Sequence, residues 1–456
     1  MKTKNINLFL FSLGSAFFFF VSVISYTEDI SIISISTVYL LIYILVIWDI
    51  SNIPKLTFGM IFFIILFGFG HIIKTGYIFS NIYESKTIGY FTVNQFDFSY
   101  SSIFVLLFIQ SSVLIAAYVC IKFFSKFRFD YNYEFLTSGK SRHRFLFLIW
   151  ILSSILIILF LEKYGYGKHG LKPSGNLANF LGGFLVYFRD FTIPILGLIF
   201  LQWNFTLFPK FKWFFIIIYL LINIMIAIYG LSRASILVSI IPLFLIFLKD
   251  NNRLMNQIKI LIFFTFSFFI IFSFMQIYRS QFYGAYDLLN FNFLSPDMLL
   301  PFFEIIIKRI EGSSELMAVI SSDINNFTDF KNYFFKLLPS NEIIYNVYGF
   351  NPQVQGKAYG VSFGLAGMLF LSGSYLMVFF GTIFFLSMIF FFEIFFLNKK
   401  YVFASIFITT KLTLVIWSNM SMFFMYRYLF IIFFTLFLIS IIKLIFKVKF
   451  GELNKI

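Results

Sequence analysis

The residues best suited to chemistry in this chain of 456 residues are arginines at the ends of apolar segments. Five of them are expected on one face of the molecule, namely Arg189, Arg233, Arg279, Arg309 and Arg427. Charged side chains are costly near lipid, so charges that gather at helix ends on one side mark the place to look for function. A guanidinium is permanently charged and presents a planar set of donors, which suits an anionic ligand. Each arginine alone could equally extend to the lipid headgroups as an anchor.

Carboxylates and aromatic rings follow in a long polar stretch after Arg279. Residues 299–312 predict an amphipathic helix that lies along the membrane surface, with Glu311 near its end and Glu315 just beyond it. Either carboxylate could act as a general base, although a solvated helix face is the favoured explanation of any one of these acids. Tyr283 belongs to a group of aromatic and amide residues that would suit a sugar ligand, but an aromatic ring at the membrane interface is the favoured explanation.

The composition predicts the elements that must position these residues. Hydrophobic residues make up 60% of the chain and charged residues 12%, whereas a soluble domain carries about 25% charged residues. The excess apolar surface requires lipid to cover it. We therefore predict an all-α, polytopic membrane helix bundle that forms one integral membrane domain over residues 1–456, with about twelve spans of about 20 residues each. The predicted spans are 7–25, 29–48, 56–73, 102–121, 145–161, 189–203, 213–229, 236–249, 260–277, 375–397, 402–418 and 425–445.

The distribution of basic residues predicts the orientation of the bundle. Twelve spans place both termini on one side, and 20 of the 35 lysines and arginines fall there; 14 fall on the other side and Lys411 lies within a span. By the positive-inside rule the termini and the basic loop 122–144 face the cytoplasm, and the loops 74–101 and 279–374 face outward. The net charge of +15 then reflects topology, and we expect no nucleic-acid partner.

Signals of metal or nucleotide chemistry are missing from the sequence. The three histidines, His71, His143 and His169, are widely separated, so we expect no histidine metal site and no cofactor. The chain contains no Walker loop and no G-x-S-x-G nucleophile elbow. Lys411 has no acidic neighbour in the sequence, so either it lines a polar cavity or the boundary of its span is misplaced.

This layout resembles the bacterial oligosaccharide repeat-unit polymerases, that is, the O-antigen or capsule polymerases of the Wzy type. The shared features are the number of spans, the short outer turn at Ser232-Arg233, the single large outer loop in the second half and the step Tyr426-Arg427-Tyr428 into the last span. Many members of that family carry an acid before the span that follows the large loop. The corresponding residues 360–368 contain none.

The resemblance implies a metal-independent glycosyltransferase in the bacterial cytoplasmic membrane. Its substrates would be oligosaccharides on undecaprenyl diphosphate, and a flippase and a chain-length regulator would be its partners beside the bilayer. Arginines would bind the diphosphate and stabilise its developing charge. The resemblance gives the catalytic roles to Arg233 and Arg279 with Glu311 or Glu315 as the base, and the substrate-binding roles to Arg309, Arg427, Arg189 and Tyr283.

Two other functions fit the same sequence. A flippase or another transporter of lipid-linked oligosaccharides would also be polytopic, but transporters tend to show internal repeats and charged or broken helices at mid-membrane. The sequence shows no internal repeat. An O-antigen ligase shares the outer arginines and the lipid-linked donor.

Overall fold

The computed structural model describes residues 5–81, 96–127, 140–167, 179–230, 238–244, 312–322, 326–334, 363–418 and 422–446, with 87–88, 91–92, 235, 259 and 347 as short pieces. Almost all of these residues are helical. Within this described part, nine helices are long and apolar enough to cross a membrane, and the apolar helix Val402–Trp417 is slightly shorter. The predicted all-α, polytopic membrane bundle is therefore confirmed.

The first part of the chain contains four spans. They are α1 (Ile6–Tyr26), α2 (Ile30–Ser51), the continuous helix made of α3 (Phe58–Phe67), the π-helical segment η1 (Gly68–Ile73) and α4 (Lys74–Phe79), and α5 (Tyr100–Phe124). The connection before α5 carries two short antiparallel strands, β1 (Thr87–Ile88) and β2 (Phe91–Thr92). Side-chain oxygens of Asp29, Thr57 and Ser99 accept hydrogen bonds from the first turns of α2, α3 and α5, which fixes where these spans begin.

The remaining described elements form two further groups. The middle of the chain gives α6 (Lys140–Lys163), α7 (Asn179–Tyr187), the π-helical segment η3 (Phe188–Thr192), α8 (Ile193–Leu207), the short 3₁₀ turn η4 (Pro209–Phe211) and α9 (Lys212–Gly230). The last third gives α13 (Ser313–Ser321), α14 (Phe327–Phe334), α16 (Gly364–Phe370), α17 (Tyr375–Asn398), α18 (Val402–Ser418) and α19 (Met422–Phe446).

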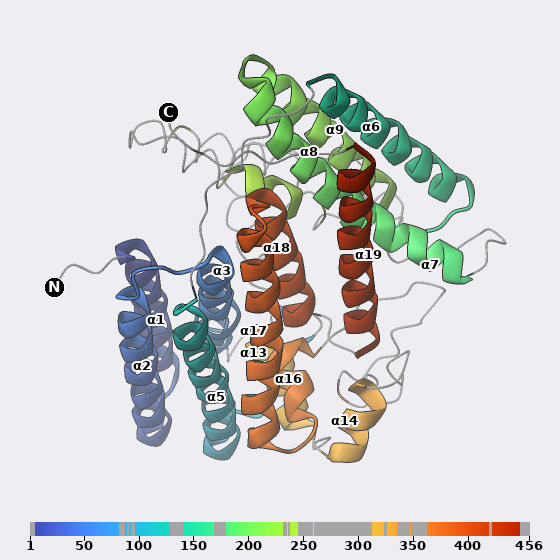
Figure 1. The fold of residues 1–456 in the computed structure, drawn as a ribbon. Helices are drawn as coiled ribbons and strands as arrows, with labels where there is room; N and C mark the ends of the chain where they lie inside the picture. The colour runs from blue at the N-terminus through green and yellow to red at the C-terminus, as the bar shows by residue number, and fades with distance from the viewer. Residues whose placement is uncertain are drawn as a thin grey trace, which may run out of the picture.

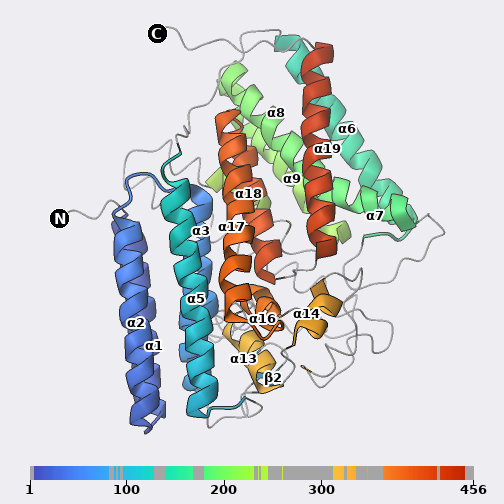
Figure 2. The same ribbon diagram turned by 60° about the horizontal axis from the view of Figure 1, so that its bottom comes forward.

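The hairpin of α17 and α18 joins two groups of helices (Figure 1). On one side α17 packs on α5 and α18 packs on α3, and on the other side α18 packs on α8. Figures 1 and 2 both place the start of α1 and the end of α19 at one end of the bundle, and α13, α14 and α16 at the opposite end. The described part of the large loop thus lies at the end opposite the first and last described residues.

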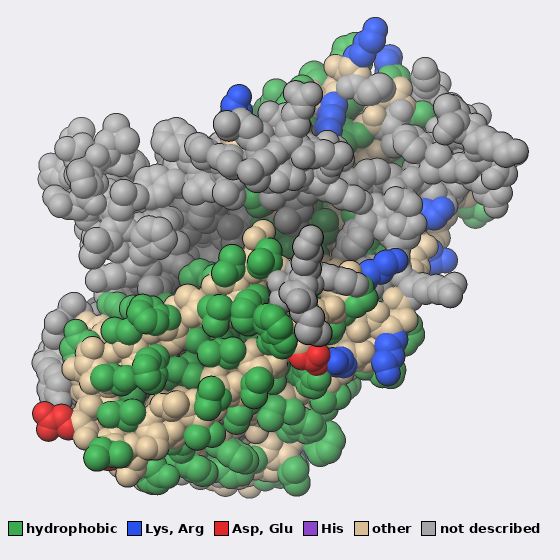
Figure 3. All heavy atoms as spheres, turned by 90° about the vertical axis from the view of Figure 1, so that its left-hand side faces the viewer, with side chains coloured by type: hydrophobic (Ala, Val, Ile, Leu, Met, Phe, Trp, Pro, Cys, Tyr) green, Lys and Arg blue, Asp and Glu red, His purple; other side chains and the backbone are tan. Residues whose placement is uncertain are grey.

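The outer surface of the bundle is built for lipid. Large apolar side chains such as Phe17, Ile30 and Leu156 are exposed over most of their surface. Figure 3 shows such residues covering a broad face of the molecule, with the charged side chains at its borders. A continuous apolar face of this size is not found on a soluble monomer, so it is the surface that contacts the bilayer.

Two predicted span boundaries are wrong. The span predicted at 189–203 begins near Leu181, so Arg189 and Asp190 lie inside it and do not open it. The span predicted at 56–73 continues to Phe79, so Lys74 belongs to a buried helix and not to an outer loop. In both places the helix continues past a charged residue, and a π-helical segment lies there: η1 ends directly before Lys74, and η3 contains Arg189 and Asp190. The predicted span 260–277 lies outside the described residues, and 236–249 is described only in part.

Candidate functional site

Arg189 is a buried arginine inside a membrane span. Its side chain is only 1% exposed, and it lies in the π-helical segment η3. Its Nε donates to Asp190 Oδ1 at 2.7 Å, and its Nη2 donates to the carbonyl oxygen of Gly167 at 3.0 Å. Gly167 and Gly230 leave the room that the guanidinium occupies, because a Cβ at either position would come within 3.0 Å of it. Gly167, which follows α6, and Gly230, the last residue of α9, therefore both contact η3 through the side chain of Arg189.

Arg427 is brought to the same region from α19. Its Nη1 lies 3.4 Å from the hydroxyl oxygen of Tyr187, and its guanidinium carbon lies 5.4 Å from the centre of that ring. The next residue, Tyr428, makes an edge contact with Tyr187 at 5.5 Å between ring centres. Unlike Arg189, Arg427 is exposed. One tyrosine at the end of α7 thus holds an exposed arginine next to the segment that carries the buried one.

Lys411 adds a third basic residue from the middle of α18. It is close enough to Asp190 and Arg189 to interact electrostatically with both. We call Arg189, Asp190, Lys411 and Arg427, with Tyr187 and Tyr428, the arginine cluster. Its ionisable members among the described residues are two arginines, one lysine and one aspartate. Two permanently charged guanidinium groups near a single described carboxylate suit an anionic ligand better than a cationic one.

A second charged cluster ties α13 into the bundle. Lys74 is fully buried, and its Nζ lies 3.2 Å from Glu315 Oε2. The same carboxylate oxygen accepts hydrogen bonds from the backbone N–H of Gly312 at 2.7 Å and from the hydroxyl of Ser314 at 2.9 Å. Gly312 packs directly on the carbonyl of Gly70 in η1, where any Cβ would overlap it. The first turn of α13 is therefore fixed by charge and by close backbone contact.

Buried hydroxyl and amide groups complete this second cluster. The hydroxyls of Ser313 and Thr75 are 2.6 Å apart, and Gln110 Nε2 of α5 donates toward both, at 3.0 Å and 3.2 Å. We call Lys74, Thr75, Gln110, Ser313 and Glu315 the α13 anchor. It joins the large loop to two spans.

The α13 anchor lies deep in the bundle. Gln110 is ten residues into α5, which corresponds to a depth of about 15 Å below the start of that helix. The other end of α13 reaches the start of α5, where the backbone N–H of Asp97 donates to Ser321 Oγ at 3.2 Å. α13 therefore runs from the interior to the surface, and part of the large loop enters the bundle. Such a segment is tolerated at this depth because protein surrounds it.

The start of α5 is held by Asp97, which lies outside the membrane spans. Its carboxylate accepts hydrogen bonds from the hydroxyl of Ser102 and from the backbone N–H and hydroxyl of Ser99. These hydrogen bonds hold the pKa of Asp97 below its usual value.

Glu393 is a further buried acid, and its partners show a structural role. Its carboxylate accepts from Thr57 Oγ1 at 2.6 Å and from the backbone N–H of Gly59 at 2.8 Å. An anion at this position satisfies the free donors at the start of α3 and interacts well with the positive end of the helix. It ties α17 to α3.

α18 lies between the arginine cluster and the α13 anchor. Lys411 belongs to the arginine cluster, and Trp417 on the same helix makes edge contacts with His71 at 5.3 Å and with Phe63 at 5.5 Å. Toward the other side, Phe407 packs on Phe191 of η3. α18 therefore carries Lys411 of the arginine cluster and also contacts the continuous helix that carries Lys74 and Thr75 of the α13 anchor.

The structure brings together two of the residues that the sequence proposed for the site and places a third elsewhere. Arg189 and Arg427 meet in the arginine cluster. Glu315 lies in the α13 anchor, so the prediction that it lies on a solvated helix face is wrong. Its carboxylate is buried in the bundle, where Lys74 provides the compensation that water would give at the surface. The other proposed site residues are Arg233, Arg279, Arg309, Glu311 and Tyr283, and they lie outside the described residues.

Sequence reasoning missed Asp190, Tyr187 and Lys74 as members of these clusters. The available signal was a charge within an apolar run, since residues 75–79 remain mostly apolar after Lys74 and residues 191–201 remain apolar after Asp190. Lys411 gave the same signal, and the carboxylate near it, Asp190, belongs to another span. Comparison of the chain with protein-family models, with curated proteins and with solved structures gave no match.

Proposed function

We propose that this protein polymerises oligosaccharide repeat units carried on undecaprenyl diphosphate, at the outer face of the bacterial cytoplasmic membrane. The observation that carries the proposal is the arginine cluster, where two arginines from η3 and α19 and one lysine from α18 lie near a single described carboxylate. A diphosphate between a lipid and a sugar is an anion that must lie at the membrane surface. It matches both the charge and the amphipathic surroundings of the cluster.

The chemistry assigns a role to each part of this cluster. A hydroxyl oxygen of the acceptor sugar attacks the anomeric carbon of the donor glycan, and the bond from that carbon to the diphosphate oxygen breaks. Undecaprenyl diphosphate leaves with the electron pair, and the hydroxyl proton passes to a carboxylate or to water. Arg189, Lys411 and Arg427 stabilise the charge that grows on the leaving diphosphate, which is most effective where water is scarce.

The aromatic rings beside the cations suit the sugar side of the substrate. Tyr187 and Tyr428 form an edge-to-face pair next to Arg427. The large loop contributes the buried helix α13 (Figure 2). In this proposal the α13 anchor fixes the loop so that its remaining residues face the substrate, and Glu315 positions the loop.

One observation favours a flippase as a second candidate. Lys411 and the Lys74–Glu315 pair lie well inside the bundle, and ionisable groups at that depth are common in transporters of polar or ionic substrates. The two functions predict different fates of the substrate. Without a flippase, lipid-linked units stay in the cytoplasmic leaflet, whereas without a polymerase single units reach the outer face.

Deletion of the gene followed by complementation tests the proposal. We expect the deletion strain to carry single repeat units on the outer face, and Arg427→Lys and Arg189→Lys to restore little polymer although both variants insert at normal levels. Lysine keeps the charge but loses the planar pair of donors, and loss of one such contact costs on the order of 10²–10³ in rate.

The matched control is Arg128→Lys in the basic loop, which should restore wild-type polymer. Wild-type chain length from both Arg427→Lys and Arg189→Lys would remove the arginine cluster from the mechanism. Accumulation of units only in the cytoplasmic leaflet of the deletion strain would favour the flippase.

A further inference from the structure

A groove runs along the surface of the bundle between the first half of α6 and the first half of α9, whereas Arg189 contacts Gly167, which follows α6, and Gly230, at the end of α9. The groove has a volume of about 340 Å³, within the range of small-molecule sites. Its lining is apolar except at one position, and it consists of Arg144, Phe147, Leu148, Ile151, Phe211, Phe214, Phe215 and Ile218. Leu148 and Phe214 are more than half exposed. The groove therefore opens toward the lipid.

Basic side chains gather at one end of this groove and are held there by aromatic rings. Arg144 is exposed, and its guanidinium carbon lies 4.2 Å from the centre of the Phe208 ring. Lys212 lies over the ring of Phe205 at 5.2 Å, and Lys210 precedes it in an exposed turn. Contact with an aromatic ring orients the Arg144 guanidinium at this end of the groove. None of the eight residues that line the groove is acidic.

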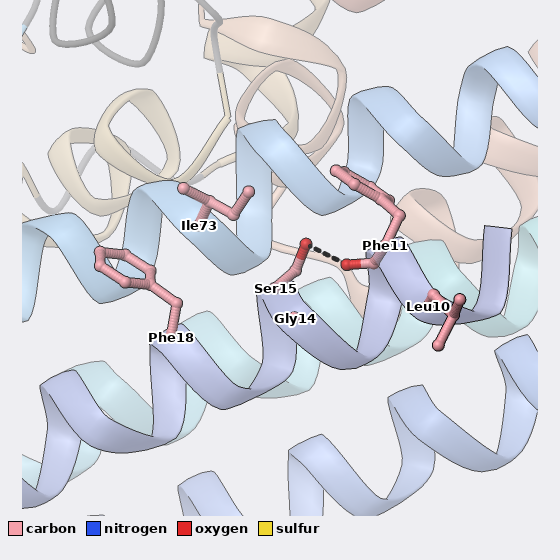
Figure 4. Close-up of a pocket in the computed structure, with 6 residues that line it drawn as sticks. All are labelled: Leu10, Phe11, Gly14, Ser15, Phe18 and Ile73. Carbon is pink, nitrogen blue, oxygen red and sulfur yellow. Dashed lines mark hydrogen bonds between the residues drawn. The ribbon is translucent and has the colours of Figure 1, made fainter. Parts of the chain in front are cut away.

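A second groove on the same molecule provides a contrast. It lies between α1 and η1 and has a volume of about 390 Å³, with Leu10, Phe11, Gly14, Ser15, Phe18 and Ile73 as its lining (Figure 4). The hydroxyl of Ser15 donates to the backbone carbonyl of Phe11 in its own helix, as the dashed line shows. No charged side chain lines this groove, so it can accept an acyl chain but has no group that selects a headgroup.

We propose that the groove between α6 and α9 is a binding site for a phospholipid with an anionic headgroup. One acyl chain lies along the phenylalanine and isoleucine side chains, and the phosphate contacts Arg144 with Lys210 and Lys212 nearby. Basic pockets between membrane helices bind anionic headgroups through this combination of charge and apolar length. The groove is on the side of the bundle where α6 begins, which is the end that carries the start of α1 and the end of α19 (Figure 1).

Native mass spectrometry of the purified full-length protein tests this site. The protein in detergent is incubated with equal amounts of phosphatidylglycerol and phosphatidylcholine, and the ratio of the two retained lipids is recorded. We expect the wild type to prefer phosphatidylglycerol. Arg144→Gln should lower this preference about fivefold, the effect expected for one basic residue near an anionic headgroup. Leu148→Trp, which fills the groove, should lower phosphatidylglycerol retention without a change in charge.

Two variants serve as matched controls, and size-exclusion chromatography shows that each protein is folded. Lys399→Gln removes an exposed cation that lies over a phenylalanine ring at 6.0 Å outside the groove, and Gly14→Leu fills the uncharged groove of Figure 4. Both should keep the wild-type lipid ratio. Equal retention of the two lipids by the wild type, or an equal effect of Arg144→Gln and Lys399→Gln, would overturn the proposal. The proposal would also be overturned if the purified protein retained a polyprenyl phosphate at Arg144 in place of phosphatidylglycerol.

Discussion

Replacement of Glu315 by glutamine separates a structural role from a catalytic one. The substitution keeps the size of the side chain and one oxygen acceptor for the Gly312 N–H, but it leaves the ammonium group of Lys74 without its paired charge. Lys74 is fully buried and the Glu315 side chain is 5% exposed, so water cannot replace the lost partner. A buried charge that loses its partner destabilises a protein by about 3–5 kcal/mol.

The double variant Lys74→Met with Glu315→Leu gives the size of the coupling. It removes both charges and substitutes apolar groups of similar volume, a change that is often neutral or stabilising. We expect the double variant to be closer in stability to the wild type than either Lys74→Met or Glu315→Leu alone. These four proteins form a double-mutant cycle, with an expected coupling energy of about 2–3 kcal/mol. Such a coupling energy would show that the two side chains act as one unit in the folded protein.

Unfolding in mixed micelles of detergent and SDS provides the free energies, and polymer length in the complemented deletion strain provides the activity. We expect Glu315→Gln to lower stability and activity together, and the double variant to recover part of both. Stability within about 0.5 kcal/mol of wild type for Glu315→Gln, the range of an ordinary surface change, would refute the α13 anchor. Normal stability with abolished activity would identify Glu315 as the catalytic base.

Three further predictions follow from the topology, the arginine cluster and the start of α5. A reporter fused after Arg144 should lie in the cytoplasm, and a reporter fused after Asn325 should lie outside. Localisation of both reporters on the same side would contradict the predicted orientation. Gly230→Ala places a Cβ 3.0 Å from Nη2 of Arg189 and should displace the guanidinium group. This displacement should lower polymerisation about tenfold at a normal protein level. Wild-type polymer from this variant would show that the position of the guanidinium group is not critical. The serine hydrogen bonds hold the pKa of Asp97 down, so its contribution to stability is fully present above the ordinary carboxyl pKa of about 3.9 and is lost as the pH falls through its lowered pKa. The thermal midpoint should therefore drop more between pH 6 and pH 3 for the wild type than for Asp97→Asn, and parallel curves would contradict this.

The fold was accessible from sequence because length and apolarity alone determine which segments can span a bilayer. α1, α2 and α17 lie within a few residues of their predicted bounds. The two span boundaries that were predicted wrongly lie where a charged residue occurs within a helix. Lys74 and Arg189 looked like the limits of a span, since a lone charge in lipid is unfavourable, and the partners that make them tolerable come from distant parts of the chain.

Only part of the candidate site could be predicted from the sequence, for the same physical reason. Arg189 and Arg427 were chosen as arginines on one face, and the structure brings both next to Asp190 and Tyr187. The proximity of Lys411 to Asp190 could not be seen in the sequence, because they lie on different helices. Glu315 was chosen for its charge alone, and the lysine that pairs with it is 241 residues away. Spacing along the chain predicts neighbours on one helix, but contacts between helices depend on the packing.

Purified protein in liposomes, supplied with lipid-linked repeat units extracted from the deletion strain, tests the central claim most directly. The measured quantity is the amount of joined glycan together with the undecaprenyl diphosphate released. We predict that one diphosphate carrier is released for each glycosidic bond formed, without added metal or nucleotide, and that Arg427→Lys lowers both amounts equally. Movement of intact units between the two leaflets with no bond formed and no carrier released would contradict the account.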